Sequence, residues 1–184
     1  MAHISLPAGL PGISGPLNQY PETALHLRGL AQALLRGPSS LTPGEREMIA
    51  TYVSSQNNCW FCTNSHRAAT RYLLVEEETP AELVDQVCQD LETAPVNDKI
   101  RALLMIAGQV QQGGRRVSEE NVAKARLAGA DDKAIHDTVL IAAAFCMFNH
   151  YVDGLATWAP EKESDYEEQG ALLAQHGYVT PTTG

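Results

Sequence analysis

The sequence shows no excess of basic charge, no apolar run of membrane length and no pattern of a secretory signal. Lysine and arginine number 13 against 22 acidic residues, which gives the 184-residue chain a formal net charge of −9. Because binding to nucleic-acid phosphates needs a basic face, we expect no nucleic-acid partner. No apolar run reaches the roughly 20 residues that span a bilayer, so we expect no membrane partner. With the missing signal pattern, these features favour a cytoplasmic protein.

Cysteine is scarce, and strand patterns and nucleotide-binding loops are missing. The 4 cysteines comprise one Cys-x-x-Cys pair and two isolated residues, which is not the pattern of a disulfide framework. No segment alternates as a strand does, and no glycine-rich phosphate loop is present. We therefore predict no cofactor. The 44% hydrophobic content suffices for a sizeable core in one domain, residues 1–184.

Apolar periodicity and capping residues predict that the chain is helical. Thr42 with Glu45, and Thr79 with Glu82, have the spacing of capping boxes. Asn97 or Asp98, Ser118 and Asp131 are the predicted starts of later helices. The predicted helices cover residues 22–35, 42–56, 59–75, 80–91, 97–110, 118–129 and 131–150.

Both ends of the chain are predicted to lie outside these helices. In the N-terminal arm, residues 1–21, prolines recur too closely for any helix. Apolar residues between the prolines argue against a free tail, so the arm is expected in a groove of its own subunit or of a neighbour. The C-terminal extension, residues 160–184, begins with an acidic stretch and ends in Pro, Thr and Gly. It is predicted to be a surface extension.

The late helix predicted at residues 131–150 is unusually apolar. Its residues 139–148 form an almost unbroken apolar run, so we expect burial on most sides, in the core or at a subunit contact. Such a helix and an apolar arm exceed what a monomer of this size usually leaves uncovered. They therefore predict a homo-oligomer.

The segment with the strongest chemical signal is residues 42–66, two predicted helices with a tight break between them. If Asn58 caps the second helix, Cys59, Cys62 and His66 fall on one helical face. Cα atoms three residues apart on a helix lie about 5 Å from each other, within the range that a disulfide tolerates. A helix N-terminus and a nearby imidazole both favour a thiolate. His66 is one turn from Cys62, which is therefore the predicted nucleophile.

Glu47 borders the apolar stripe of the first of these helices. If drawn inward, its carboxylate would orient His66 and relay protons; the alternative is a solvated glutamate, and both interpretations stay open here. Cys88 is predicted to be a buried apolar residue. Cys146 and His150 stand four apart, but a core cysteine and a helix-end histidine are favoured over a second redox or metal pair.

Three segments carry a resemblance to a known family. The main one reads Arg46-Glu47-x-Ile49-Ala50 and then Val53-Ser54-x-x-Asn57-x-Cys59-x-x-Cys62-x-x-x-His66, and residues 30–38 precede it. The third is residues 145–155, which contain Asn149-His150-x-x-Asp153. Together they resemble the alkylhydroperoxidase D-like branch of the carboxymuconolactone decarboxylase family, and within it the peroxidase-related group, whose late helix usually ends Asn-Arg-x-x-Asp. The resemblance covers about residues 25–158.

The resemblance implies an all-α bundle that assembles into trimers or hexamers and acts as an antioxidant peroxidase on hydrogen or organic peroxides. The reductant would be a dithiol, such as a lipoyl or thioredoxin-like protein. In the family, peroxide oxidises the second cysteine to a sulfenic acid, the first resolves it as a disulfide, and Glu and His relay protons. By position these are Cys62, Cys59, Glu47 and His66. The chain departs at Phe61, where the best-studied branch has a second histidine.

Two other functions remain as alternatives. One is a redox-sensing or zinc-binding module with Cys59, Cys62, His66 and perhaps Glu47 as ligands. The sequence has no second Cys-x-x-Cys or His-x-x-x-His to complete it, so no metal site is predicted. The other is a cofactor-free decarboxylase or ring-opening enzyme like the family's founding branch, which does not rely on a cysteine pair.

Overall fold

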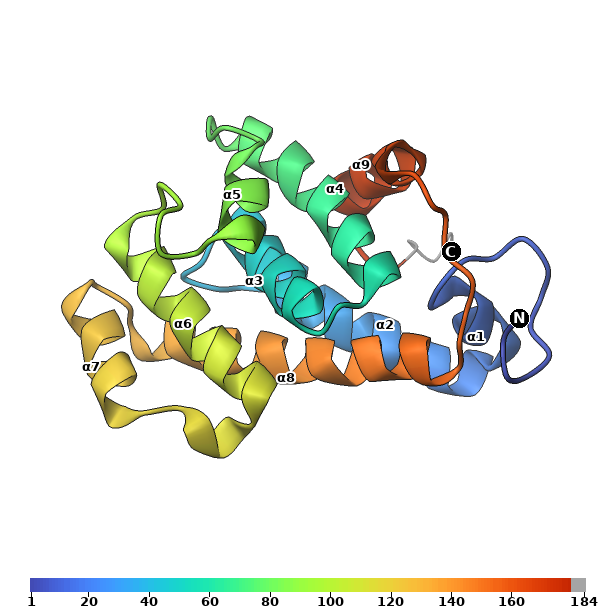
Figure 1. Ribbon diagram of the computed structural model, residues 1–184, viewed down its shortest axis with the longest axis horizontal. Helices are drawn as coiled ribbons and strands as arrows, with labels where there is room; N and C mark the ends of the chain where they lie inside the picture. Colours follow the sequence, from blue (N-terminus) through green and yellow to red (C-terminus); the bar gives the residue numbers. More distant parts are fainter. Residues whose placement is uncertain (180–184) are drawn as a thin grey trace.

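The structure, a computed structural model, describes residues 1–179 and consists of helices joined by loops, with no strand in that range (Figure 1). The all-α prediction is confirmed. No helix in the described range is long and apolar enough to cross a membrane. The elements are α1 (Ser14–Gln19), α2 (Pro21–Arg36), α3 (Pro43–Gln56), α4 (Trp60–Glu76), α5 (Leu83–Gln89), α6 (Asp98–Gln112), η1 (Gly114–Arg116), α7 (Glu119–Leu127), α8 (Asp132–Gly154), η2 (Glu163–Tyr166) and α9 (Glu167–His176).

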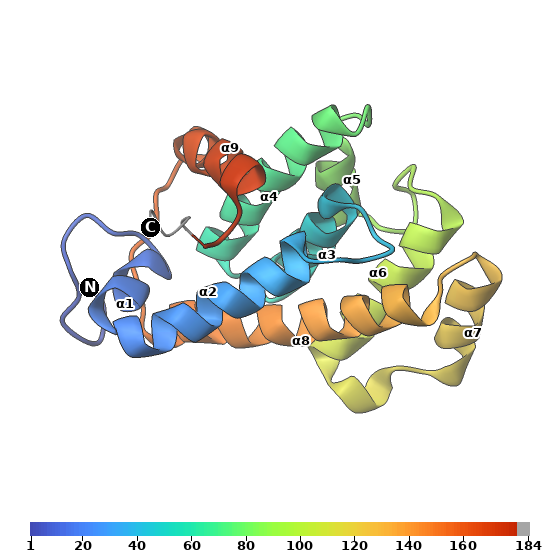
Figure 2. The same ribbon diagram turned by 180° about the vertical axis from the view of Figure 1, so that it is seen from behind.

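Helix α3 lies at the centre of the bundle and packs against α2, α4, α5, α6 and α8. The long helices α2 and α8 run along one side, and α9 lies along α4 on the other (Figures 1 and 2). One face of α8, including Ile141 and Phe145, is buried, whereas Leu140 and Met147 on its other face are exposed in the single chain. The predicted burial on most sides therefore holds for only part of α8.

Most of the predicted helix starts are confirmed by hydrogen bonds of the capping side chains. Thr42 Oγ1 accepts the N–H of Glu45 at 3.1 Å, and the Glu45 carboxylate accepts the N–H of Thr42 at 2.9 Å. This reciprocal pair is a capping box, which satisfies N–H groups that the helix leaves free. Asn97, Ser118 and Asp131 likewise cap α6, α7 and α8.

The prediction that Asn58 caps α4 is wrong, because Asn58 ends α3 instead. Asn58 has a φ of 56°, in the left-handed region that asparagine tolerates. Its N–H donates to Ser55 O at 3.0 Å, and the N–H of Cys59 donates to Ser54 O at 3.1 Å. These two bonds make a Schellman motif, in which Asn58 is the left-handed residue. Cys59 itself occupies the N-cap position of α4, with an extended backbone.

The predicted helix at residues 80–91 is shorter in the structure, where α5 covers Leu83–Gln89. Thr79 is not its cap: the Thr79 hydroxyl donates to Glu77 O at 3.3 Å. Pro80 instead opens a turn, which the N–H of Leu83 closes by donating to Pro80 O at 3.1 Å. The turn uses the residues that the capping box would have needed.

The prediction that the N-terminal arm contains no helix is also wrong, since α1 forms with Pro16 inside it. Pro16 lies in the first turn, where its missing N–H would have had no partner in any case. The arm lies on its own subunit. The N–H of His3 donates to Leu155 O at 2.9 Å, and the N–H of Gly12 donates to Trp158 O at 2.8 Å.

The prediction of a surface extension at residues 160–184 holds for the acidic stretch 161–168, which is exposed except at Tyr166, and is wrong for the residues that follow it up to 179; residues 180–184 lie outside the described range. Helix α9 packs closely on α4, and a Cβ at Gly170 would overlap Ala68. The chain then turns at Gly177, which has a φ of 71°. Tyr178 reaches a partly buried position between α2, α3 and α4.

Candidate active site

The two sulfur atoms of the Cys-x-x-Cys pair lie together under a nearly complete cover. Cys59 is 0% exposed and Cys62 is 4% exposed, and both are free thiols. The two side chains are neighbours in one buried cluster. The interaction with the Cys62 side chain raises the pKa of Cys59 far above its usual range, and burial and the charge of Cys62 raise it further. Cys59 therefore keeps its proton at neutral pH.

Glu47 and His66 form the second half of the site. Glu47 projects from α3 and is 0% exposed, so the interpretation as a solvated glutamate is wrong. Its Oε2 lies 2.7 Å from Nδ1 of His66 on α4. A carboxylate at this distance orients an imidazole and fixes which nitrogen carries the proton. Of the two interpretations of Glu47 that the sequence leaves open, the structure supports the inward carboxylate beside His66.

Two further residues contact Glu47 and were missed from the sequence. Arg36, the last residue of α2, places Nη2 2.7 Å from Glu47 Oε1. Tyr178 Oη donates to the same oxygen at 2.6 Å. The Arg36 guanidinium also lies 5.4 Å from the centre of the Tyr178 ring. Neither residue carries a local sequence signal, since an arginine at a helix end and a tyrosine near a chain end are common.

The ionisation of the second half follows from these contacts. Burial raises the pKa of Glu47, but the His66 ring, Arg36 and the Tyr178 hydroxyl together outweigh it and leave the pKa lowered. For Tyr178, burial and the neighbouring Glu47 charge raise the pKa well above the usual value. Glu47 is therefore a carboxylate and Tyr178 a neutral phenol at neutral pH. A buried carboxylate is otherwise very unfavourable, and the Arg36 charge offsets that cost.

A network of polar side chains holds the break between α3 and α4. Asn149 of α8 donates through Nδ2 to Ser54 Oγ at 3.0 Å and accepts from Asn57 Nδ2 at 2.8 Å. Cys146 lies 3.6 Å from the same Asn57 nitrogen. His150 is exposed and takes no part. The structure thus does not bring Cys146 and His150 together as a second redox pair, and it leaves Cys88 partly exposed in contact with the core.

A cavity of about 70 Å³ lies where the two halves meet, and Cys62 and His66 both line it. The remaining wall is mostly apolar, with Ile13 from the arm, Phe61, Phe145 and Phe148 among its residues. Next to it lies a larger hollow of about 580 Å³, which shares Ile13, Phe61 and His66 with the cavity. The cavity at Cys62 is therefore adjacent to a hollow large enough for a small molecule.

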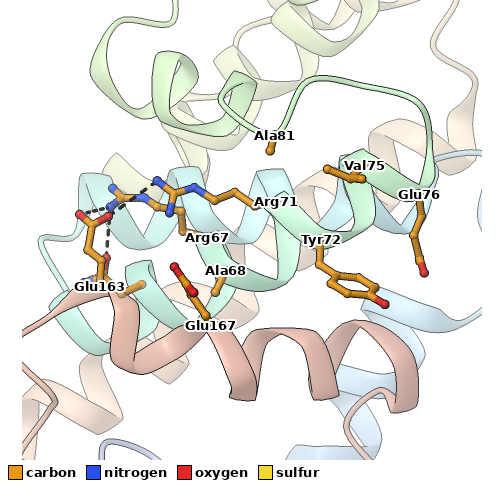
Figure 3. Close-up of a pocket in the computed structure, with 10 residues that line it drawn as sticks. Arg67, Ala68, Arg71, Tyr72, Val75, Glu76, Ala81, Glu163 and Glu167 are labelled. Carbon is orange, nitrogen blue, oxygen red and sulfur yellow. Dashed lines mark hydrogen bonds and ion pairs between the residues drawn. The ribbon is translucent and has the colours of Figure 1, made fainter.

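A separate hollow of about 470 Å³ lies on the other side of α4 (Figure 3). Both of its arginines are paired with carboxylates: Arg67 Nη1 lies 3.0 Å from Glu163 Oε1, and Arg71 Nη2 lies 2.8 Å from the nearby Asp85. No sulfur atom and no part of the Glu47 cluster lines it. The cavity at Cys62 is therefore the candidate active site.

The zinc alternative gains no support from this geometry. Within residues 1–179, no three His, Cys, Asp or Glu side chains are grouped so that they could hold a metal ion. Both Glu47 oxygens are already bound, Oε2 by His66 and Oε1 by Arg36 and Tyr178. A carboxylate so engaged is a poor metal ligand, because coordination would break these bonds.

Comparisons with known proteins agree with the fold. Residues 21–103 match the sequence model of the carboxymuconolactone decarboxylase family. No curated protein matches the chain. One similar crystal structure is an alkylhydroperoxidase AhpD core, an uncharacterized peroxidase-related protein from Ralstonia eutropha JMP134. It is 26% identical with a TM-score of 0.75, and the match covers 88% of this chain and 81% of that one.

A second similar structure is an uncharacterized peroxidase-related protein from Silicibacter sp. TM1040. It is also 26% identical, with a TM-score of 0.73, and the match covers 85% of this chain and 80% of that one. The resemblance predicted from the sequence is therefore confirmed. Residues 21–103 carry the sequence pattern of the carboxymuconolactone decarboxylase family, and the chain has the all-helical fold of alkylhydroperoxidase AhpD-like, peroxidase-related proteins.

Proposed function

We propose that this protein is a thiol-dependent peroxidase that reduces hydrogen or organic peroxides, with Cys62 as the nucleophile. The observation that carries the proposal is the cavity lined by both Cys62 and His66. The free thiol of Cys59 lies beside Cys62, and the Glu47 carboxylate lies within hydrogen-bond distance of His66. The peroxidase-related descriptions of the two similar structures support the same class of reaction.

In the first step, His66 accepts the proton of Cys62, and the thiolate attacks one oxygen of the peroxide. A bond forms between Cys62 Sγ and that oxygen while the O–O bond breaks. Cys62 is thereby oxidised to a sulfenic acid and the peroxide is reduced. The leaving oxygen takes the proton from His66 and departs as water or an alcohol, so His66 ends the step neutral.

In the second step, the Cys59 sulfur attacks the sulfenic sulfur of Cys62, a disulfide forms, and water leaves with the Cys59 proton. The main cause that raises the pKa of Cys59 is its interaction with the Cys62 side chain. Oxidation of Cys62 to the sulfenic acid removes the thiolate charge beside Cys59, so the Cys59 thiol loses its proton more readily after the first step than before it. An external dithiol, on a lipoyl or thioredoxin-like protein, then reduces the disulfide and is itself oxidised.

The test is peroxide consumption by metal-free protein with a dithiol reductant. Cys62→Ser is expected to be inactive, whereas Cys59→Ser reacts once and holds a sulfenic acid on Cys62 that dimedone traps for mass mapping. Cys88→Ser, which alters a thiol outside the site, is the control and keeps the wild-type rate. Trapping on Cys59 in Cys62→Ser, with none on Cys62 in Cys59→Ser, would reverse the two roles. A wild-type rate in Cys62→Ser would exclude the proposal.

We further propose that the enzyme acts in the cytoplasm as a homo-oligomer, a trimer or hexamer, in antioxidant defence. The exposed apolar face of α8, with Leu140 and Met147, supports assembly because such faces are usually covered. Light scattering at micromolar concentration should give the mass of a trimer or hexamer. The mass of one chain would contradict this part of the proposal.

The family description names a decarboxylase, which keeps cofactor-free decarboxylation or ring opening as a second candidate. That chemistry would use His66 and Glu47 as acid and base without a cysteine nucleophile. The two candidates therefore differ in Cys62→Ser. The variant abolishes a peroxidase, while a decarboxylase would keep its activity.

A further inference from the structure

The end of the described chain is held against the site by several specific contacts. After the turn at Gly177, the N–H of Tyr178 donates to Gln32 Oε1 at 2.8 Å. Arg36 Nη2 donates to Leu173 O in α9 at 3.0 Å while it also pairs with Glu47. The position of Tyr178 is thus fixed from both α2 and α9.

Tyr178, Glu47 and His66 form a closed triangle of polar contacts. Tyr178 Oη lies 2.6 Å from Glu47 Oε1 and 3.2 Å from His66 Nδ1, and His66 Nδ1 lies 2.7 Å from Glu47 Oε2. A neutral phenol has one proton, which goes to the carboxylate, and its lone pairs can accept from an N–H. All three contacts are satisfied together only when Nδ1 carries the proton. The second ring nitrogen, Nε2, is then the base.

We propose that Tyr178 is a positioning residue that sets the basicity of His66 through Glu47. By sharing the charge of Glu47 with Arg36, the Tyr178 hydroxyl weakens the hold of the carboxylate on an imidazolium. His66 then both accepts the Cys62 proton and releases it to the leaving oxygen. This inference rests on the proposed peroxidase function for its role in catalysis, but the effect on His66 does not depend on that function.

The remaining surroundings of His66 add few competing charges. Besides Glu47 and Tyr178, the titratable or charged groups that face it or line its hollow are Arg36 and Arg28 of α2, Cys62 of its own helix, and His176 of α9. From α8, Phe145 packs edge-on against the imidazole with ring centres 4.6 Å apart. Within the described residues, Glu47 is the acidic group bonded to His66, so a change in its charge acts directly on the imidazole.

Tyr178→Phe removes the hydroxyl alone, because the ring contacts do not need it. The Tyr178 and His66 rings are stacked, with centres 6.0 Å apart and 16° between their planes, and the Arg36 guanidinium lies over the Tyr178 ring, 5.4 Å from its centre. Phenylalanine keeps both contacts. Tyr72→Phe is the matched control. Its hydroxyl accepts from Gln175 Nε2 at 2.6 Å, so it also joins α4 to α9, but away from Glu47.

The first measurement is a histidine NMR titration, in which His66→Gln assigns the His66 signals. Wild type should show the Nδ1–H tautomer. In Tyr178→Phe the midpoint of His66 should rise by about one pH unit, the order expected when a charged group loses one hydrogen bond. The sign follows because the carboxylate, with fewer donors, holds the imidazolium proton more tightly. Arg36→Gln should shift it in the same direction and further, and Tyr72→Phe should not shift it.

The second measurement is the pH profile of peroxide reduction. In Tyr178→Phe the acid-side midpoint of kcat/KM should move upward with His66, and the rate below that midpoint should fall by about tenfold for one unit. An unchanged His66 midpoint in Tyr178→Phe, or an Nε2–H tautomer in wild type, would overturn the inference whatever the activity. If wild type consumes no peroxide but the NMR shift is seen, the proposed function fails and the role of Tyr178 in setting His66 stands.

Discussion

The two ends of the chain each cover one half of the site, by different means. The N-terminal arm lies at the end of the molecule where α4 starts and α8 ends (Figure 1). The N-terminal arm covers the sulfur half, where Ile13 packs against the cysteine pair and Gly12 lies against the Phe61 ring. The C-terminal segment covers the carboxylate half, where Tyr178 binds Glu47.

The difference follows from what each half needs. The arm is fixed by backbone bonds from His3 and Gly12 and by apolar packing, and no side-chain hydrogen bond joins residues 1–13 to the rest of the described chain. Such a cover shields the thiols from water, and its removal leaves no charge without a partner. A buried carboxylate instead needs permanent donors, because losing one leaves a charge without compensation. We therefore expect the arm to be removable and the C-terminal segment to be essential.

The largest effect is expected from Glu47→Gln, which breaks the carboxylate half and leaves the sulfur half intact. Without the anion, His66 loses its orienting partner, and peroxidase rate should fall by a factor of about 10² to 10⁴. The Cys59–Cys62 disulfide should still form on strong oxidation. Kinetics at neutral pH give the rate, and mass mapping gives the disulfide.

The matched control for Glu47→Gln is Glu163→Gln, whose carboxylate pairs with Arg67 outside the site. Its rate should equal that of wild type. Because Glu47→Gln leaves Arg36 nearly buried without a counter-charge, its stability is also at risk. The double variant with Arg36→Met removes both charges and should recover stability but not rate. A wild-type rate in Glu47→Gln would mean that only the sulfur half is functional.

The next effect compares the two covers directly, with Tyr178→Ala and Ile13→Ala. Both side chains are partly buried. Tyr178→Ala removes a large aromatic ring and also the hydroxyl that donates to the buried Glu47 carboxylate, so it should lower the free energy of unfolding by about 3–5 kcal/mol. Ile13→Ala removes only apolar contacts and should cost about 1–2 kcal/mol. Iodoacetamide should label Cys59 and Cys62 faster in Ile13→Ala, relative to global stability, than in Tyr178→Ala. Equal labelling at matched stability would remove the distinction between the covers.

The same contrast explains how much of the site could be predicted from the sequence. Cys59, Cys62 and His66 stand within one short segment, where helical spacing alone brings them together. Tyr178 lies 131 residues from Glu47 along the chain, and only the packing of α9 on α4 brings it to the site. No local pattern encodes that packing, and the part of the C-terminal extension after residue 168 was therefore misassigned to the surface.

The fold was predictable for a similar reason, because capping and apolar periodicity are local. The errors fell where one residue type suits two structures. Asparagine is favoured both at a helix start and in the left-handed position that ends a helix. At Asn58 the backbone bonds from Asn58 and Cys59 back to α3 select the helix end. Closely spaced prolines predict no helix around Pro16, yet proline is tolerated in a first turn.

A smaller effect is expected from Gly12→Val, which tests how firmly the arm is seated. Gly12 has a φ of 52°, and a Cβ there would overlap the Phe61 ring. The arm should detach locally at a cost of about 1–3 kcal/mol, the usual range for such backbone strain, and both thiols should become more reactive. Gly9→Ala is the control, since Gly9 has a φ of 78° but no atom near its Cβ position. Equal thiol labelling in the two variants would show that the arm does not cover the sulfur atoms in solution.

The smallest effect concerns the pH dependence of stability, to which the carboxylate half of the site should contribute and the sulfur half should not. The pKa of Glu47 is lowered from a reference of 4.5, because His66, Arg36 and Tyr178 outweigh the opposing effect of burial. A lowered pKa means that the unfolded chain binds the proton more readily than the folded one. The stability from this group is therefore fully present above about pH 4.5 and is lost as the pH falls through the folded-state pKa.

Urea unfolding of wild type and of Glu47→Gln between pH 7 and pH 3 should show this contribution as a difference between the two curves. Wild type should lose stability relative to Glu47→Gln as the pH falls below 4.5, by about 1.4 kcal/mol for each unit by which folding lowers the pKa. Ile13→Ala, which alters only the sulfur half, should follow the wild-type pH dependence with a constant offset. If Glu47→Gln runs parallel to wild type over this range, Glu47 is not held as an anion, and the assignment of the C-terminal segment as the fixed cover of a charge would be wrong.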